Sequence, residues 1–363
     1  MSLNTLAPRE VSRRIPASGI RRLIGQHLSE LVSILVAVAL AIFFTSQSPN
    51  FFTSDNALVL SQFIAPFAIF ALAEVPVLIL GEIDLSVGQM YIVSPFFVTY
   101  WNNAGVPVWP SIVLALLVCC GLGLINGLVT VKLRVPSFIA TLGMAFALRG
   151  IVLIYSNGAP TNPIGSGMLV NILGGWSWSE AFWALGIAAM LHVMLRGTTF
   201  GLHIVAVGGN TESARESGIG VDYVKIWCFV LCAFIGGLIG ILDGYHIGSI
   251  DPASSGLTFM FYGVAAAVIG GTALTGGRGT MIGAVLGAIV LGTLEDGFHV
   301  ISVSSFAYDL ILGIAIVIAM FLNVQIERAT VRGVGRGSFA RILLFFTRIP
   351  DFSFSRRKEP VRQ

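Results

Sequence analysis

The sequence predicts an all-α polytopic membrane protein with about ten transmembrane helices and with both the N- and C-termini in the cytoplasm. Of its 363 residues, 55% are hydrophobic and only 11% are charged, which is more apolar surface than a soluble fold of this length can bury. When the long apolar segments are taken as ten spans, all but one of the 21 Lys and Arg residues fall on one side of the membrane. Short cytoplasmic loops carry such an excess of basic residues, so this asymmetry sets the orientation.

Each expected span is an apolar segment of about 20 residues, the length that crosses a bilayer. We expect these spans near residues 28–46, 57–80, 84–101, 109–131, 136–156, 180–196, 225–247, 258–273, 280–297 and 306–324. The spans divide the chain into a basic cytoplasmic segment (1–27), a transmembrane domain (28–325) and a basic cytoplasmic tail (326–363). Acidic residues interrupt the stretch 57–101, where one span plus a broken or re-entrant helix is the alternative. Irregular backbone at that depth is tolerated only inside protein.

The sequence contains no recognisable catalytic or metal-binding motif. The four cysteines lie in apolar segments without His or Asp at ligand spacing, which favours packing over a disulfide or a metal site: Cys119, Cys120, Cys228 and Cys232. No phosphate-binding loop with its lysine and no His-Glu-x-x-His pair occurs. We therefore expect the chain to carry a solute without an ATPase site or cofactor of its own. Its basic ends suit anionic lipid headgroups and do not imply nucleic acid.

The segment GEIDLSVG (81–88) places carboxylates in an apolar background, where each costs several kcal/mol unless it is paired or hydrated. One interpretation makes it a gate or a subunit contact beside a backbone break, formed by Gly81, Glu82, Asp84, Ser86 and Gly88. In the other, the segment is a cytoplasmic hairpin in which a side-chain oxygen of Asp84 caps the next helix.

The segment VGGNTESARESGIG (207–220) is a polar island in an expected cytoplasmic loop. Asn210 or Thr211 can cap a short helix that extends through Ser217, and Gly218 and Gly220 can end it. Two turns of exposed polar helix are marginal alone, so such a helix makes most sense if it docks against another protein. An ordinary connecting loop is the alternative.

Two glycine-rich segments complete the set of unusual features. In VIGGTALTGGRGT (268–280), small residues predict a tight cytoplasmic turn between closely packed helices. An internal duplication would explain its echo of the first segment, in which Gly81, Leu85, Ser86 and Gly88 match Gly270, Leu274, Thr275 and Gly277. The longest external loop (157–178) is either a docking surface or a solvated connector with interfacial aromatic residues.

Several motifs occur in an order that resembles the ribose-type permeases of bacterial ATP-binding cassette importers, over roughly residues 28–325. They are SPNFF (48–52), GEIDLSVG (81–88), VPSFIATLGM (135–144), LRG (148–150), YSNGAP (155–160), GGN and SGI around 208–219, and VIGGTALTGGRGT (268–280). The resemblance implies an all-helical ABC importer permease that pairs with a second copy or a sister permease. It also implies an ABC ATPase on the inside and a periplasmic substrate-binding protein on the outside.

The resemblance implies that the loop 207–220 presents a coupling helix to the ATPase, through Gly209, Asn210, Glu212, Ser213, Ala214, Arg215, Glu216, Ser217 and Gly218. The chain would then be the permease subunit of a binding-protein-dependent importer in a bacterial inner membrane. It would move a small polar solute, a monosaccharide or sugar-like molecule, driven by ATP hydrolysis on a separate subunit.

Polar groups in or at the ends of apolar spans are the candidates for the solute pathway: Arg149, Asn157, Asp243 and Asp309. For Arg149, a structural pair with an acidic neighbour is the alternative. A different function, ion-coupled secondary transport, would use Glu74, Glu82 or Asp84 to bind a proton or sodium. A membrane enzyme would need a nucleophile and base arrangement, which the spacing does not support.

Overall fold

The computed structural model describes residues 28–304, apart from 164, 166 and 255, together with residues 307, 310, 311, 313, 314, 316–318 and 321. Helices supply the regular structure of this part, and its β pairing is limited to one isolated bridge between Thr161 and Ile250. The expected all-α class is therefore confirmed for the described residues.

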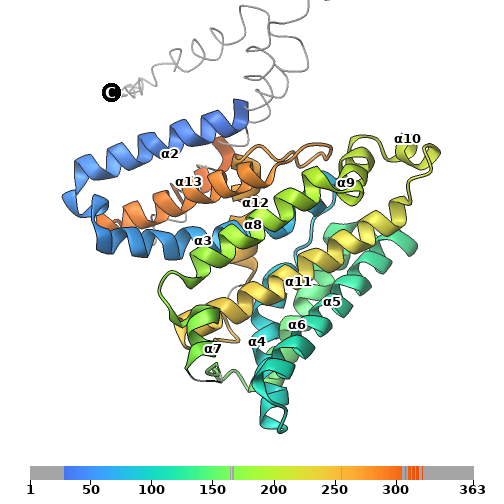
Figure 1. The fold of residues 1–363 in the computed structure, drawn as a ribbon, viewed down its shortest axis with the longest axis horizontal. Coiled ribbons are helices and arrows are strands. Elements are labelled where there is room, and N and C mark those ends of the chain that lie inside the picture. The colour runs from blue at the N-terminus through green and yellow to red at the C-terminus, as the bar shows by residue number, and fades with distance from the viewer. Residues whose placement is uncertain are drawn as a thin grey trace, which may run out of the picture.

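The helices run in the order shown in Figure 1. The first half contains α2 (Leu28–Gln47), η1 (Pro49–Phe52), α3 (Ser54–Ile79), α4 (Val87–Asn103), α5 (Val108–Lys132) and α6 (Ser137–Ser156). The second half contains α7 (Met168–Val170), η2 (Asn171–Gly175), α8 (Ser179–Gly197), α9 (Thr199–Gly209), α10 (Thr211–Glu216), α11 (Val221–Ile247), α12 (Gly256–Ile269) and α13 (Met281–Val300).

Several of these helices are long and apolar enough to cross a membrane. Six helices in the described part qualify: α2, α3, α5, α6, α11 and α13. A seventh span results if the pair Met168–Gly175 and Ser179–Gly197, bent by 69°, counts as one. Helices α4 and α12 have only 17 and 14 residues, and most of the expected span 306–324 lies outside the described residues. The described helices thus have the length and composition of membrane spans, whereas the total of ten spans stays a prediction.

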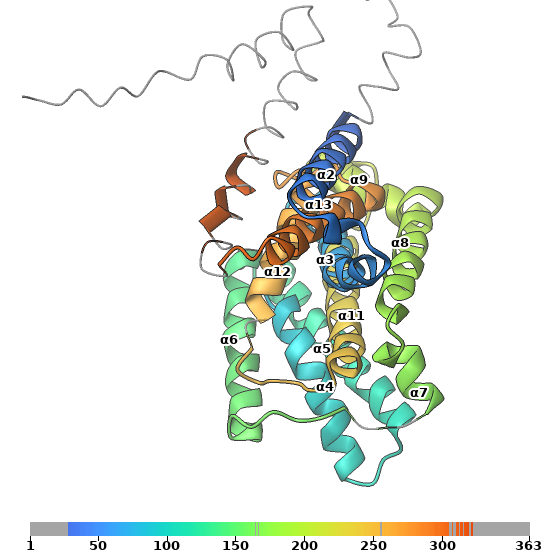
Figure 2. The same cartoon turned by 90° about the vertical axis from the view of Figure 1, so that its left-hand side faces the viewer.

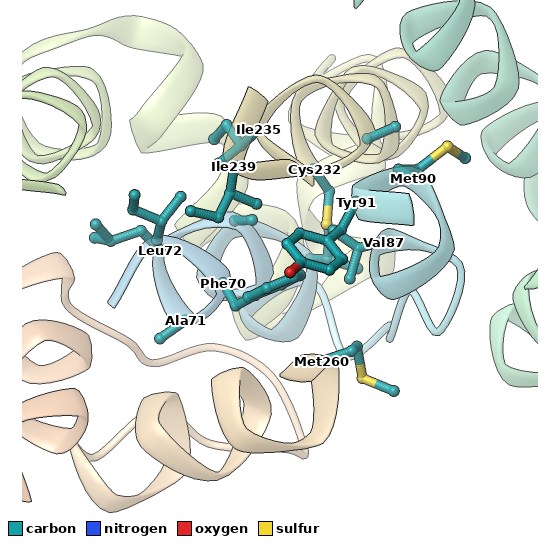
Figure 3. Packing of buried hydrophobic residues seen from close by; sticks show 14 of the residues in the cluster. Phe70, Ala71, Leu72, Val87, Met90, Tyr91, Cys232, Ile235, Ile239 and Met260 are labelled. Carbon is teal, nitrogen blue, oxygen red and sulfur yellow. The ribbon is translucent and has the colours of Figure 1, made fainter. Parts of the chain in front are cut away.

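Helices α3, α11 and α13 form the centre of the bundle. Between 61% and 67% of their apolar windows is buried, against 11% for α2 and 28% for α6. Figure 3 shows Tyr91 of α4 in this core beside Phe70 of α3, with Ile235 of α11 and Met260 of α12 nearby. The peripheral helices expose their apolar side chains, as expected where lipid is the solvent.

Glycines allow some of these helices to touch backbone to backbone. A Cβ atom added at Gly240 of α11 would lie 2.0 Å from the carbonyl oxygen of Tyr91 in α4. In lipid, no hydrophobic force drives helices together. Membrane helices therefore associate through close van der Waals packing, which such small residues allow. The contact between α4 and α11 therefore depends on the absence of a side chain at this position.

We expect Gly240→Ala to destabilise the fold by about 1–3 kcal/mol, because the added methyl group must push α4 and α11 apart. The matched control is Gly186→Ala in α8, where a Cβ would meet nothing within 4 Å. The thermal unfolding midpoint of the detergent-purified protein should fall for the first variant only. Equal midpoints would contradict the packing described here.

Candidate functional site

The polar segment 207–220 folds as the short helix α10, which projects from one end of the bundle (Figure 1). Asn210 is its N-cap, because its Oδ1 accepts a hydrogen bond of 3.0 Å from the Ser213 amide. Gly218 follows the helix with a φ of +81°, the left-handed conformation that glycine adopts readily. Both ends of the helix are therefore fixed by the residues that the sequence suggested.

Helix α10 is held to the bundle by few contacts, and most of its surface remains free. Ala214 is buried, whereas Glu212, Arg215 and Glu216 are exposed. Asp222, in the first turn of α11, forms an ion pair with Lys132 of α5 at 2.7 Å and lies 4.0 Å from Arg215. This acidic residue, which the sequence reasoning missed, links α10 to the ends of two long helices.

Helix α9 connects α10 to the end of α3. A Cβ atom at Gly208 would lie 1.9 Å from the carbonyl oxygen of Ile79. The same oxygen accepts a 2.7 Å hydrogen bond from the amide of Gly277. Three segments that are far apart in the sequence thus meet at the last residue of α3.

Beyond Ile79 the chain leaves the helix and continues as an irregular segment, residues 80–86, whose last three residues are buried. Gly81 has a φ of +73° and allows the sharp turn. The amide of Ile83 donates to Ser137 Oγ at 3.3 Å, and the amide of Leu85 donates to Thr141 Oγ1 at 3.1 Å. Side chains of α6 thereby satisfy backbone groups that lipid could not.

The polar side chains of this segment are also held by neighbours. Asp84 and Ser86 have no exposed surface, and Asp84 Oδ1 accepts from both the amide and the hydroxyl of Ser86 at 2.9 and 2.6 Å. Asn126 of α5 donates to Ser86 Oγ at 2.7 Å. Asp84 thus holds Ser86, the residue before α4. Residues 84–86 are buried, whereas Gly81 near the start of the segment is exposed.

Two further carboxylates lie in and beside the segment. Glu82 pairs with Lys225 of α11, and both side chains are less than a fifth exposed. Glu74 of α3 is fully buried, with Oε1 3.9 Å from Cys232 Sγ. The ion pair of Glu82 with Lys225 is costly to break, because one charge would be left uncompensated in a poorly hydrated place. The pair of Glu82 therefore ties the segment to α11.

The two glycine-rich segments that echo each other lie side by side in the structure. The nearest atom to a Cβ added at Gly81 would be the carbonyl oxygen of Thr275, at 3.6 Å. Gly276 and Gly277 have φ values of +87° and +80°, so the segment 268–280 contains the tight turn that the sequence predicts. Gly270 lies against the backbone of Gly283, which brings α12 close to α13.

The pathway candidates lie in different places. Arg149 and Asn157 are exposed, the first on α6 and the second at its C-cap with a φ of 51°. Asp243 is buried in α11, accepts a hydrogen bond from the Tyr91 hydroxyl and lies beside Glu180 of α8. Asp309 falls outside the described residues. The structure does not bring the three described candidates together in one site, since Arg149 and Asn157 are exposed on α6 and Asp243 is buried in α11.

The described residues of the loop 157–178 are partly folded against the bundle. Thr161 and Ile250 exchange two backbone hydrogen bonds of 3.0 and 2.8 Å. His246 Nδ1 lies 3.1 Å from the carbonyl oxygen of Gly174, and Trp183 donates to the carbonyl oxygen of Ile172 at 2.9 Å. The loop is therefore more than a solvated connector over these residues.

Side chains that fix the interrupted segment could not be recognised from the sequence, because each looks like an ordinary helix residue. They are Asn126, Ser137, Thr141 and Lys225. Among the described residues, no group of three or more His, Cys, Asp or Glu side chains could hold a metal ion.

The sequence is similar to known permeases over most of its length. It is 36% identical to a xylose/arabinose import permease of Sulfolobus acidocaldarius, covering 83% of this chain and 86% of the relative. It is 32% identical to a ribose import permease of Escherichia coli K12, covering 84% and 97%, and 31% identical to that of Bacillus subtilis, covering 86% and 95%. No solved structure matches the chain.

A family model described as branched-chain amino acid transport system, permease component, matches residues 56–320. This range contains α10, the interrupted segment 80–86 and the glycine-rich turn. The chain belongs to this family of membrane-embedded transport permeases.

Proposed function

We propose that this chain is the transmembrane subunit of a binding-protein-dependent ABC importer in a bacterial inner membrane. Its supporting observation is similarity to sugar import permeases over more than four fifths of the chain. The excess of basic residues beside the spans supports a cytoplasmic location for α10 and both termini. A periplasmic binding protein would then deliver the solute on the opposite side, where the loop 157–178 lies.

The transported solute is a small polar molecule of the monosaccharide class. Relatives named for ribose and for xylose or arabinose have similar identities to this chain, so pentoses are the first candidates. Ion-coupled transport gains no support from these relatives. The pairing of Glu82 with Lys225 also argues against Glu82 as a free ion-binding carboxylate.

Helix α10 couples the permease to the separate ATPase. Its exposed residues Glu212, Arg215 and Glu216 would contact a groove on that subunit, since polar side chains at an interface give specificity and register. A displacement of α10 would be transmitted to α5 and α11 through Asp222, and to the end of α3 through Gly208. The interrupted segment 80–86 would move as the gate.

Proteoliposomes that hold the permease with the ATPase of the same gene cluster test the proposed function. With ATP on the cytoplasmic face and the binding protein on the other, we expect uptake of labelled ribose or xylose. Uptake should stop when ATP is replaced by a non-hydrolysable analogue. Uptake by the chain alone, driven by a proton or sodium gradient, would contradict the proposal.

The triple variant Glu212→Ala, Arg215→Ala, Glu216→Ala tests the coupling helix. We expect the ATPase to be lost from the detergent-purified complex, because the exposed polar surface is gone. Asn210 still caps α10 and Ala214 still anchors it, although the contact of Arg215 with Asp222 is removed as well. The matched control is Arg196→Ala, Thr199→Ala, which removes exposed polar groups beside α9. Equal recovery of the ATPase with both variants would place the coupling contact elsewhere.

A further inference from the structure

Two buried carboxyl groups that the proposed function does not use lie beside each other at one end of the bundle. Glu180 is the second residue of α8, and Asp243 lies near the C-terminal end of α11. These residues are only 3% and 5% exposed. Figure 2 shows α7, which precedes α8 in the chain, at the end of the bundle opposite to α9. The pair therefore lies at the end that is remote from the coupling helix.

Within the described part of the chain, this pair has fewer hydrogen-bond donors than it needs. Asp243 accepts a hydrogen bond from the hydroxyl of Tyr91 in α4. Both oxygens of Glu180 are buried and have no donor among the described residues. Glu180 and Asp243 lie close enough for a hydrogen bond between their side chains. Because an ionised carboxylate can only accept, such a bond forms only when one of the two groups carries a proton.

The charges around the pair lead to the same conclusion. Neither carboxyl group forms an ion pair with a described lysine or arginine. The described titratable groups that act on the pair are Tyr91 of α4 and His246 of α11, whereas α3 and α5, which also pack on α11, contribute none. His246 could balance at most one of two carboxylates. Two adjacent negative charges in a poorly hydrated place are costly, so a proton is the simplest way to remove the second.

Backbone contacts on both sides hold Asp243 in place. A Cβ atom at Gly240 would lie 2.0 Å from the carbonyl oxygen of Tyr91, and one at Gly174 would lie 2.3 Å from the carbonyl oxygen of Leu242. Helix α4 and the segment η2 thus touch the backbone of α11 immediately around Asp243. Since η2 leads into α8 within a few residues, the start of α8 is held there as well, and the two carboxyl groups have little room to separate.

We propose that Glu180 and Asp243 share one proton, and that the resulting carboxyl–carboxylate hydrogen bond locks the adjoining ends of α8 and α11 against α4. The proton belongs to the pair rather than to either residue. Loss of this proton at alkaline pH would leave two negative charges that push α8 away from α11.

The lock has a consequence for transport, and this step alone rests on the proposed function. In the proposed importer, the loop 157–178 and the start of α8 face the outside, while α8 continues into α9 and α10. The carboxyl pair would therefore position the outer end of the helix that leads to the coupling surface. We infer that uptake depends on the protonation of this pair.

Infrared spectroscopy of the detergent-purified protein at neutral pH tests the shared proton. Glu180→Gln should lose the C=O stretching band of one neutral carboxylic acid, because the amide donates to Asp243 in place of the proton. Asp243→Asn should lose the same band, and the double variant should lose no more than either single variant. Asp55→Asn, which changes an exposed carboxyl group at the start of α3, is the control and should leave the band unchanged.

Three results would overturn the proposal. A band that is unchanged in both single variants would exclude a proton on the pair. A loss in the double variant that is twice the loss in each single variant would show two separate protons. A metal cation held between the carboxylates would give no band, and the thermal unfolding midpoint would then rise with the concentration of sodium.

The pH dependence separates a proton-dependent lock from ordinary packing. The thermal midpoint of the wild type should fall relative to that of Glu180→Gln as the pH is raised above neutral, because the amide keeps its hydrogens. Uptake in proteoliposomes should show the same contrast, with Asp55→Asn following the wild type. Parallel pH profiles for the wild type and Glu180→Gln would contradict the lock. ATP-independent uptake would defeat the import proposal and leave the infrared band and the midpoints unaffected.

Discussion

The carbonyl group of Ile79 is the contact on which the described architecture depends. The last residue of α3 faces the backbone of Gly208 in α9 and accepts the amide hydrogen of Gly277. A side chain at Gly208 would occupy the same space as that oxygen, so the three segments can meet only because glycine leaves their backbones free to touch. This contact consequently connects the exposed helix α10, through α9, to the start of the irregular segment 80–86.

Because lipid cannot form hydrogen bonds with backbone groups, side chains of neighbouring helices accept hydrogen bonds from the irregular segment 80–86. An irregular segment inside a membrane protein must find partners for its amide and carbonyl groups within the protein. Ser137 and Thr141 provide these partners for Ile83 and Leu85, and Asn126 fixes Ser86. The segment therefore has a defined position, and a small displacement of α5, α6 or α11 would change its hydrogen bonds together.

The parts of the fold and of the site that depend on local sequence signals could be predicted from the sequence. The short helix α10, its Asn210 cap and its glycine end follow from capping chemistry, and the apolar segments follow from membrane thickness. The break between α3 and α4 could be suspected from Glu82 and Asp84. By contrast, its partners on α5 and α6 are single polar residues in apolar helices, and only tertiary packing reveals which loop they face.

In the proposed mechanism, α9 carries movement from α10 to the end of α3 through Gly208. The most direct test compares uptake per ATP hydrolysed for Gly208→Ala and Gly209→Ala in the assembled transporter. A Cβ at Gly208 would lie 1.9 Å from the Ile79 oxygen, whereas one at Gly209 would meet nothing within 4 Å. We predict that both variants retain the ATPase and that only Gly208→Ala loses uptake per ATP. Unchanged uptake per ATP in Gly208→Ala would contradict transmission of movement through α9.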